Sequence, residues 1–346
     1  MVRDRALIGW HRFFRQSIAS ALSVSLFVYL FVVVIDPWDG LPLSPPLPRV
    51  PATSASRYTF PMLARNPRID SAVIGTSTSR LLRPALLDRL TGAHFVNLSM
   101  DAATAYEETR LLDVFSHAHV NARFIVIGID LNWCEPRPEA RYTNYPFPEW
   151  LYEPRRWSGY RHVFNIYAVQ ESGTQLWAML GLKRSAYPTD GYRDFGLPEA
   201  QYDLARAHEH IEAAGAAPGM SDPSLNPADF VYSTHHRLQH ALGTLPDKTR
   251  KILYFVPFAL SFQGAEGSPS RVYWDECKRR VAAMSAQVSN SLVIDFMIPS
   301  PITKDQSNYY DAIHYRPAAA IRLVEDMARA ITSPAESSDD YRILVR

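Results

Sequence analysis

Cysteine is almost missing from this chain of 346 residues, because Cys134 and Cys277 are the only two. A structural zinc site takes four ligands, and a small disulfide-rich scaffold needs several cysteine pairs, so two thiols by themselves make neither. They could form one disulfide in an oxidising compartment. The sequence leaves the distance between them open.

An excess of charge of either sign is also missing. Lysine and arginine number 36 and acidic residues 35, which gives a formal net charge of +1. A protein that binds nucleic acid needs a basic face, so we expect no nucleic-acid partner. The sequence also has no glycine-rich phosphate loop, and we therefore expect neither a nucleotide nor another cofactor.

Histidines occur in two close groups, but neither group has the neighbours of a metal site. One group is His208 with His210, and the other is His235 and His236 with His240. Both lie in polar stretches with helical patterns, and no cysteine or carboxylate cluster adjoins them. We interpret them as structural or solvated histidines and expect no bound metal.

One long stretch, Ser17–Ile35, contains nineteen residues and no charge. As a helix it is about 28 Å long, which matches the hydrocarbon core of a bilayer. Arginines precede the stretch and aspartates follow it, so the positive-inside rule predicts a cytoplasmic N-terminus. Trp10 and Trp38 lie near its two ends, where interfacial indoles are favoured.

We expect an uncleaved, single-pass anchor in the inner (cytoplasmic) membrane, with the main domain in the periplasm or outside the cell. A cleaved signal peptide is the alternative, but the apolar stretch is long and no small-x-small site lies directly before Asp36. Five prolines within Gly40–Pro51 favour an extended spacer after the anchor. The predicted organisation is a cytoplasmic tail (1–16), a transmembrane anchor (17–35), a proline-rich linker (36–69), an α/β domain (70–335) and a C-terminal tail (336–346).

The rest of the chain alternates short, apolar, β-branched runs with helical patterns. This alternation predicts an α/β fold whose parallel sheet is covered by helices on both faces. Residues 131–250 do not continue this alternation of strand and helix patterns. We therefore predict a large insertion over one edge of the sheet, with helices near 199–214 and 228–243. The expected strands are 71–74, 94–98, 124–129, 252–258 and 292–296, and other helices are expected at 104–116, at 277–288 and after Pro317.

Polar residues with catalytic potential follow three of these strands. Ser77 lies in the phrase GTSTSR after the first strand, Asn132 follows the third, and NYYDAIHYRP after the last contains Asp311 and His314. The carboxyl ends of parallel strands meet at one edge of a sheet, which is where sites form in open α/β proteins. The sequence therefore predicts that a serine, an asparagine and an Asp-x-x-His pair share one edge.

These residue types suit nucleophilic catalysis at an ester. A serine hydroxyl becomes a nucleophile when a base takes its proton, and His314 is the candidate base, with Asp311 orienting its ring. The backbone N–H of Ser77 and the side-chain amide of Asn132 could stabilise the oxyanion. Gly75 permits a sharp turn at the end of the first strand, and we expect a helix N-terminus directly after it. The alternative for each residue alone is structural: a helix cap for Ser77 and a surface loop for Asp311 and His314.

The order Gly-x-Ser, then Asn, then Asp-x-x-His resembles the SGNH/GDSL hydrolase superfamily. The apolar anchor, the Asp36–Pro37 pair and the phrases VIGTSTSR, VNLSMDAATAYE and VIGIDLNW resemble its membrane-anchored branch, which includes accessory proteins of cell-wall D-alanylation and alginate acetylation. The resemblance covers residues 70–133 and 290–330. It implies a flavodoxin-like α/β/α sandwich and ester chemistry on a cell-envelope glycan, often beside a membrane-bound acyltransferase.

Two positions depart from the family pattern. The family usually has a glycine after its second strand, whose N–H joins the oxyanion hole, and this chain has Ala102 there. The third block reads Ile-Asp-Leu-Asn instead of Gly-x-Asn-Asp, so Asp130 could occupy the place assigned to Asn132.

Three functions follow from these patterns. The first is a membrane-anchored, extracytoplasmic serine esterase or O-acyltransferase, including O-acetyltransferase, that acts on a glycan. The second is a catalytically silent accessory protein that docks to an envelope polysaccharide-modification complex. The third is a glycan-binding module that uses the aromatic residues of the insertion. The residues do not distinguish hydrolysis from transfer, or identify the acyl donor and the polymer.

Overall fold

The computed structural model describes residues 2–134, 139–217, 226–332 and 337–346. The chain forms two compact units. The first, here called the anchor unit, contains Met1–Ser54 and Glu149–Ala186, and the second, the sheet unit, contains Ala55–Pro148 and Tyr187–Arg346. The segment 131–250 therefore does not form one insertion, in contrast to the prediction, because its residues 149–186 pack with the N-terminal segment.

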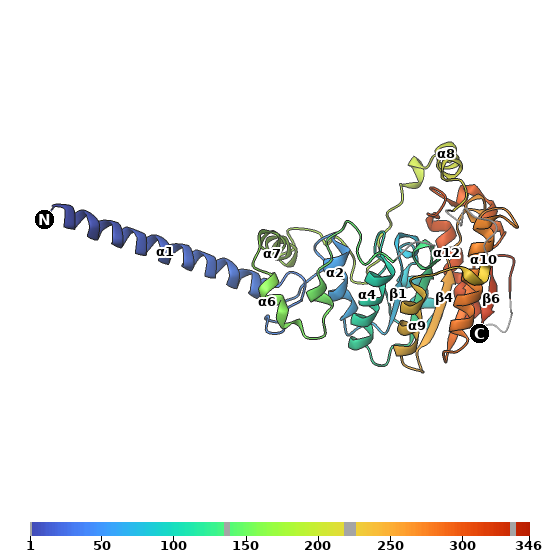
Figure 1. The fold of residues 1–346 in the computed structure, drawn as a ribbon, viewed down its shortest axis with the longest axis horizontal. Helices are drawn as coiled ribbons and strands as arrows, with labels where there is room; N and C mark the ends of the chain where they lie inside the picture. The colour runs from blue at the N-terminus through green and yellow to red at the C-terminus, as the bar shows by residue number, and fades with distance from the viewer. Residues whose placement is uncertain (1, 135–138, 218–225, 333–336) are drawn as a thin grey trace. The chain divides into compact units, whose positions relative to one another are not determined.

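The anchor unit is built on one long helix, α1 (Val2–Ile35) (Figure 1). Most of the predicted cytoplasmic tail is thus a helical continuation of the anchor. Within the described part of the chain, Trp10–Ile35 is the one helical span long and apolar enough to cross a membrane. The remaining helices of this unit are η2 (Glu149–Tyr152), η3 (Arg156–Ser158), α6 (Gly159–His162) and α7 (Ile166–Met179). Of these, α7 packs against α1.

The predicted linker ends earlier than expected. Residues 36–55 contain no helix or strand, but α2 (Ser56–Ala64) follows and belongs to the sheet unit. Its apolar residues Phe60 and Leu63 are buried. Pro61 lies inside this helix, and because prolines are rare within helices, the sequence pattern favours a linker for this segment.

A six-stranded, mostly parallel sheet forms the centre of the sheet unit. The strands are β1 (Ser71–Ile74), β2 (Phe95–Asn97), β3 (Phe124–Ile129), β4 (Arg250–Phe255), β5 (Ser291–Asp295) and β6 (Arg342–Val345), in the order β2-β1-β3-β4-β5-β6. The first five run parallel and are almost continuously buried, which accounts for their apolar sequences.

The last strand corrects the prediction of a C-terminal tail. β6 pairs antiparallel with β5 at the edge of the sheet. Its four residues alternate between exposed and half-buried, so the sequence there has no apolar run to reveal a strand. The predicted boundary between residues 335 and 336 lies outside the described residues.

Helices connect the strands by crossovers. Because β1 lies between β2 and β3, the crossovers through α3 (Pro84–Thr91) and α4 (Ala105–Ala118) run in opposite directions, and the right-handed rule places them on opposite faces. A capping box between Thr104 and Glu107 starts α4.

α12 (Pro317–Thr332) packs against α3, whereas α9 (His235–Thr244) packs against both α4 and α10 (Pro269–Ser285). Shorter helices are α5 (Leu131–Cys134), α8 (Leu204–Ala214), α11 (Pro301–Lys304), η1 (Ser77–Ser79), η4 (Glu199–Gln201), η5 (Pro227–Asp229), η6 (Leu260–Gln263) and η7 (Gln306–Asn308).

The two cysteines form a disulfide that ties α5 to α10 across 143 residues of sequence. Both are buried, at 2% exposure for Cys134 and 0% for Cys277. The structure thus settles the distance that the sequence left open. The bond also fixes the residues that follow β3, which include Asn132.

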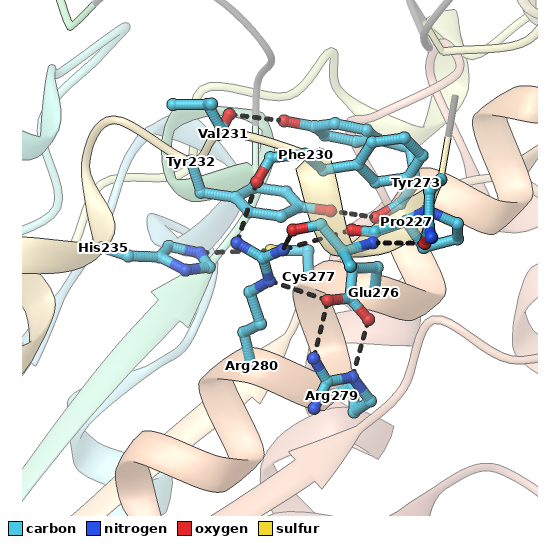
Figure 2. Close-up of polar contacts among 12 residues, drawn as sticks. Pro227, Phe230, Val231, Tyr232, His235, Tyr273, Glu276, Cys277, Arg279 and Arg280 are labelled. Atoms are coloured by element: carbon cyan, nitrogen blue, oxygen red, sulfur yellow. Dashed lines mark hydrogen bonds and ion pairs between the residues drawn. The ribbon is translucent and has the colours of Figure 1, made fainter.

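Polar contacts fasten the segment before α9 to α10 (Figure 2). Arg280 donates hydrogen bonds to the carbonyl oxygens of Phe230 at 2.8 Å and Pro227 at 3.1 Å. Glu276 accepts a hydrogen bond from the same guanidinium at 2.7 Å. These contacts hold the chain just before Thr234, whose hydroxyl donates to the carbonyl of Trp133 at 3.1 Å.

Candidate active site

Ser77 begins a short 3-10 turn directly after β1. Thr76 caps this turn, and the hydroxyls of Thr76 and Thr78 both donate to the buried carboxylate of Asp130, at 2.5 and 2.9 Å. The helix that follows this strand is the short η1, and the first α-helix after it, α3, begins only at Pro84. The carboxylate of Asp130 holds the serine turn through both threonines.

Gly75 is required for space and not for an unusual backbone angle. Its φ is not in the left-handed region, but a Cβ at this position would overlap the hydroxyl of Ser79. The same hydroxyl also lies against Gly128 of β3 and forms a 2.6 Å hydrogen bond with the buried hydroxyl of Tyr254. The two glycines thus create the space in which Ser79 holds the turn against the sheet.

The loop that carries Asp311 and His314 is closed by its flanking residues. Tyr309 and Tyr315 pair across it and are buried, at 0% and 1% exposure. The backbone N–H of Tyr310 donates to the carbonyl of His314 at 2.9 Å. One oxygen of Asp311 accepts the N–H of His314 at 2.8 Å, so this side chain also shapes the loop.

Ser77, His314 and Asp311 form a continuous chain of hydrogen bonds. The Ser77 Oγ lies 2.9 Å from Nε2 of His314, and Nδ1 of the same ring lies 2.8 Å from Oδ2 of Asp311. Burial alone would raise the pKa of Asp311, but the hydrogen bond and charge of His314, with two backbone N–H groups, bring this pKa below its usual value. Asp311 is therefore an anion at neutral pH and can orient the ring and stabilise its charged form.

Three donors lie near the serine hydroxyl. The backbone N–H groups of Ser77 and Ala102 form no hydrogen bond with any other residue in the described part of the chain. Ala102 has a φ of 48°, in the left-handed region that favours glycine, which gives a physical reason for a glycine at this place in the family pattern. The third donor is the side-chain amide of Asn132.

Asn132 and Asp130 differ in their hydrogen bonds, although both line the smaller of two cavities next to Ser77. The Asn132 side chain lines this cavity and donates one of its two amide hydrogens to Oε1 of Glu108 at 2.7 Å. Among the described residues, no other group accepts a hydrogen bond from this amide, so its second hydrogen could serve a ligand. Asp130 lies under the serine turn, where its carboxylate accepts hydrogen bonds from Thr76, Thr78 and the backbone N–H of Asn132.

Glu108 is a site residue that sequence reasoning missed. It lies on α4, is 1% exposed and also accepts a hydrogen bond from the indole of Trp133 at 3.3 Å. Burial, with the nearby charge of Asp130, raises the pKa of Glu108 well above its usual range. The sequence did contain a signal for this residue. Glu108 lies on the buried side of the amphipathic helix that follows VNLSMDAAT, where a charged residue is unusual.

Two cavities meet at Ser77, Ala102 and His314. The smaller, of about 500 Å³, is lined on its far side by Ala103, Leu131, Asn132, Thr234 and Phe258, among others. The larger, of about 760 Å³, is lined by Phe195, Tyr202, Arg206, His210 and Tyr310, among others. The reactive groups thus stand between a smaller space, whose lining mixes apolar residues with polar ones such as Asp130 and Glu139, and a larger space with aromatic and basic side chains. Most of the second lining comes from residues 195–210, whose role the sequence did not reveal.

The two histidine groups named from the sequence do not form a metal site in the structure. Within the described ranges, no group of three or more His, Cys, Asp or Glu side chains has the geometry to hold a metal ion. His235 is buried and stacks on Tyr232, with ring centroids 4.6 Å apart, whereas His236 is exposed. His210 lines the larger cavity.

No protein-family model matches this sequence, and no curated protein matches it.

Proposed function

We propose that the protein is a membrane-anchored serine esterase or O-acyltransferase of the SGNH/GDSL type that acts on a cell-envelope or exported glycan. The observation that carries the proposal is the hydrogen-bonded chain from Ser77 through His314 to Asp311, placed where two cavities meet. The residues that form this chain are those that carry the resemblance in the sequence. We infer the same flavodoxin-like sandwich for the sheet and its helices.

The proposed reaction has two halves, acylation and deacylation of Ser77, and His314 moves a proton in both. The Ser77 hydroxyl loses its proton to Nε2 of His314 while its oxygen attacks the ester carbonyl. The N–H groups of Ser77 and Ala102 and the amide of Asn132 stabilise the oxyanion. The C–O bond of the ester then breaks, and the leaving alcohol takes the proton from His314, which leaves an acyl-serine. In the second half, His314 takes a proton from water or a glycan hydroxyl, whose oxygen attacks the acyl group. The C–O bond to Ser77 then breaks, and the serine oxygen regains the proton from His314.

The cavities suggest how the two parts of the substrate are divided. We assign the acyl group to the smaller cavity, where Ala103, Leu131 and Phe258 offer apolar surface. We assign the glycan to the larger cavity, because aromatic side chains such as Tyr202 and Tyr310 suit sugar rings and polar groups such as Arg206 bind hydroxyl or acidic substituents.

The proposed location is the outer side of the inner membrane, with α1 as the single-pass anchor and the N-terminus in the cytoplasm. The charge asymmetry about Ser17–Ile35 supports this orientation, and a buried disulfide suits an oxidising compartment. A membrane-bound acyltransferase is the proposed partner and source of acyl groups. An alkaline-phosphatase fusion at Arg346 should be active, and an active cytoplasmic reporter there would overturn the topology.

A fluorophosphonate probe tests the enzymatic proposal directly. The full chain in detergent should be labelled at residue 77, and Ser77→Ala should abolish both the labelling and the cleavage of 4-nitrophenyl acetate. Ser289→Ala is the control, because this serine is exposed and is among the lining residues of neither cavity, and it should retain labelling. A folded protein that neither reacts with the probe nor cleaves any ester would contradict the proposal.

A catalytically silent accessory protein is the second candidate. It is favoured by Ala102, which stands in a backbone conformation that suits glycine. On this account Ser77→Ala would leave the cellular glycan modification intact, whereas loss of the whole protein would abolish it.

A further inference from the structure

The exposed residues of α7 include the apolar Ile166 and Trp177 as well as Gln170, and its buried residues are small or polar. Ile166 and Trp177 are 74% and 54% exposed, and Leu180, directly after the helix, is 62% exposed. At 3.6 residues per turn these three lie within an arc of about 60°. The opposite side of the helix carries its buried residues Ala168, Ser172 and Gln175. This pattern is the reverse of that expected for a helix on a water-soluble surface.

α7 and the segment before it pack against the part of α1 that is proposed to lie in the membrane. The Tyr29 hydroxyl donates to the carbonyl of Tyr160 at 3.1 Å, and its ring meets the edge of Phe164 with centroids 5.8 Å apart. The helices α1 and α7 themselves are in contact (Figure 1). Small side chains such as Ala168 and Ser172 on the buried side of α7 permit close helix packing.

The depth of this contact follows from the charges of α1. Arg15 is the last charged residue before the apolar stretch, so the hydrocarbon core begins close after it. The core then extends to about Ile35, and Tyr29 lies about 9 Å inside that end. Residues that contact Tyr29 therefore reach the outer leaflet, provided that α1 spans the membrane.

Residues typical of a membrane interface flank α7. Trp157 is 58% exposed, and the basic residues Arg161 before the helix and Lys183 after it are also exposed. The sequence had assigned the outer interfacial indole to Trp38, but Trp38 is 1% exposed and stacks on Tyr167. Exposed Trp177 and Trp157 thus take the role expected of Trp38.

We propose that the face of α7 formed by Ile166, Trp177 and Leu180 lies in the outer leaflet of the same bilayer that α1 crosses. The occupant of this face is lipid, because the neighbouring part of α1 is already surrounded by acyl chains and the two surfaces are continuous. The inference rests on the proposed membrane span of α1 and is independent of the ester chemistry. It gives the anchor unit two attachments to the bilayer, a span and a helix in the interface.

Spin labelling of the full chain in nanodiscs of phosphatidylethanolamine and phosphatidylglycerol tests this inference. Nitroxides are attached to Trp177→Cys, Ile166→Cys, Leu22→Cys on α1 and Val231→Cys in the sheet unit, while the native cysteines remain in their disulfide. Leu22 and Val231 are 66% and 72% exposed, which matches them to the test positions. The measurement is collision with oxygen, which enters lipid, relative to a water-soluble nickel chelate.

Labels at Trp177, Ile166 and Leu22 should collide several-fold more with oxygen than with the chelate, and the label at Val231 should show the reverse. If the α7 labels behave like Val231 while Leu22 is lipid-like, α7 faces water and the inference is wrong. Immobile α7 labels shielded from both reagents would show a protein partner or a second copy in place of lipid, and would also overturn it. A water-like Leu22 would instead contradict the membrane span itself.

Discussion

The side-chain amide of Asn132 donates a hydrogen bond to Oε1 of Glu108 across 2.7 Å, from α5 after β3 to the buried side of α4. This contact orients the amide while leaving its second hydrogen for the cavity next to Ser77. An oxyanion donor is effective when it is held in place before the reaction, because its reorganisation then costs nothing. In the proposed mechanism Glu108 is thus a positioning residue that acts through Asn132.

Replacement of Glu108 tests this relationship. Glu108→Gln keeps one oxygen that can accept the hydrogen bond from Asn132, although its NH₂ group then faces the indole N–H of Trp133. It should therefore retain more esterase activity than Glu108→Ala. Glu108→Ala removes the acceptor and should lower kcat about tenfold or more with a smaller change in KM, because the donor acts mainly in the transition state. Asn132→Ala should lower kcat similarly, and the double variant should add little. Equal losses in Glu108→Gln and Glu108→Ala would contradict a role in positioning.

His314 should matter more than Asp311. His314 moves the proton, whereas Asp311 orients and supports the ring, and its side chain is 37% exposed, so water weakens its field. His314→Ala should reduce kcat/KM by a factor of about 10⁵. Asp311→Asn should reduce it by a smaller factor, about 10³ to 10⁴. Hydrolysis of 4-nitrophenyl acetate by the two variants gives the comparison. Full activity in His314→Ala would exclude the triad.

The parts of the fold that follow from local patterns were predictable. β1 and β3 have the predicted bounds, because a buried parallel strand requires a continuous apolar run. The same reasoning put Ser77 and His314 at one edge, since residues after parallel strands meet there.

What the sequence did not reveal depends on contacts between distant residues. β6 is a strand because β5 offers an open edge, and Glu108 is a site residue because Asn132 reaches it from 24 positions away. Trp38 is buried because the segment with Tyr167 folds back onto it, more than a hundred residues later. Local propensity carries no signal for such long-range contacts.

The disulfide should support both stability and catalysis. It closes a loop of 143 residues between α5 and α10, so its loss should lower the free energy of unfolding by roughly 4 kcal/mol. Asn132 is two residues from Cys134, and kcat should fall as this segment loosens. The double variant Cys134→Ala/Cys277→Ala is compared with the natural chain by denaturant unfolding in detergent, with and without reductant. Reductant should destabilise the natural chain and leave the variant unchanged. Two titratable thiols in the unreduced, unfolded natural chain would contradict the bond.

His235 should make the protein less stable in mild acid. Its ring stacks on Tyr232 and lies 3.5 Å from the Cys277 sulfur (Figure 2). Burial, with the charge of Arg280, lowers the pKa of His235 to about 4 in the folded chain. The unfolded chain takes up this proton near pH 6.5, so between pH 6.5 and 4 only the unfolded state is protonated at this position.

The free energy of unfolding should therefore fall with pH in this window, by up to about 1.4 kcal/mol per unit from this group. His235→Gln removes the titrating ring, so its unfolding free energy should fall less between pH 6.5 and 4.5, by roughly 2 kcal/mol. His236→Gln is the matched control, because His236 is exposed on the same helix, and it should keep the full dependence. Denaturant unfolding at both pH values gives the comparison. If His235→Gln and His236→Gln show the same pH dependence, the buried ring does not stay neutral, and its packing against Tyr232 tolerates the charge.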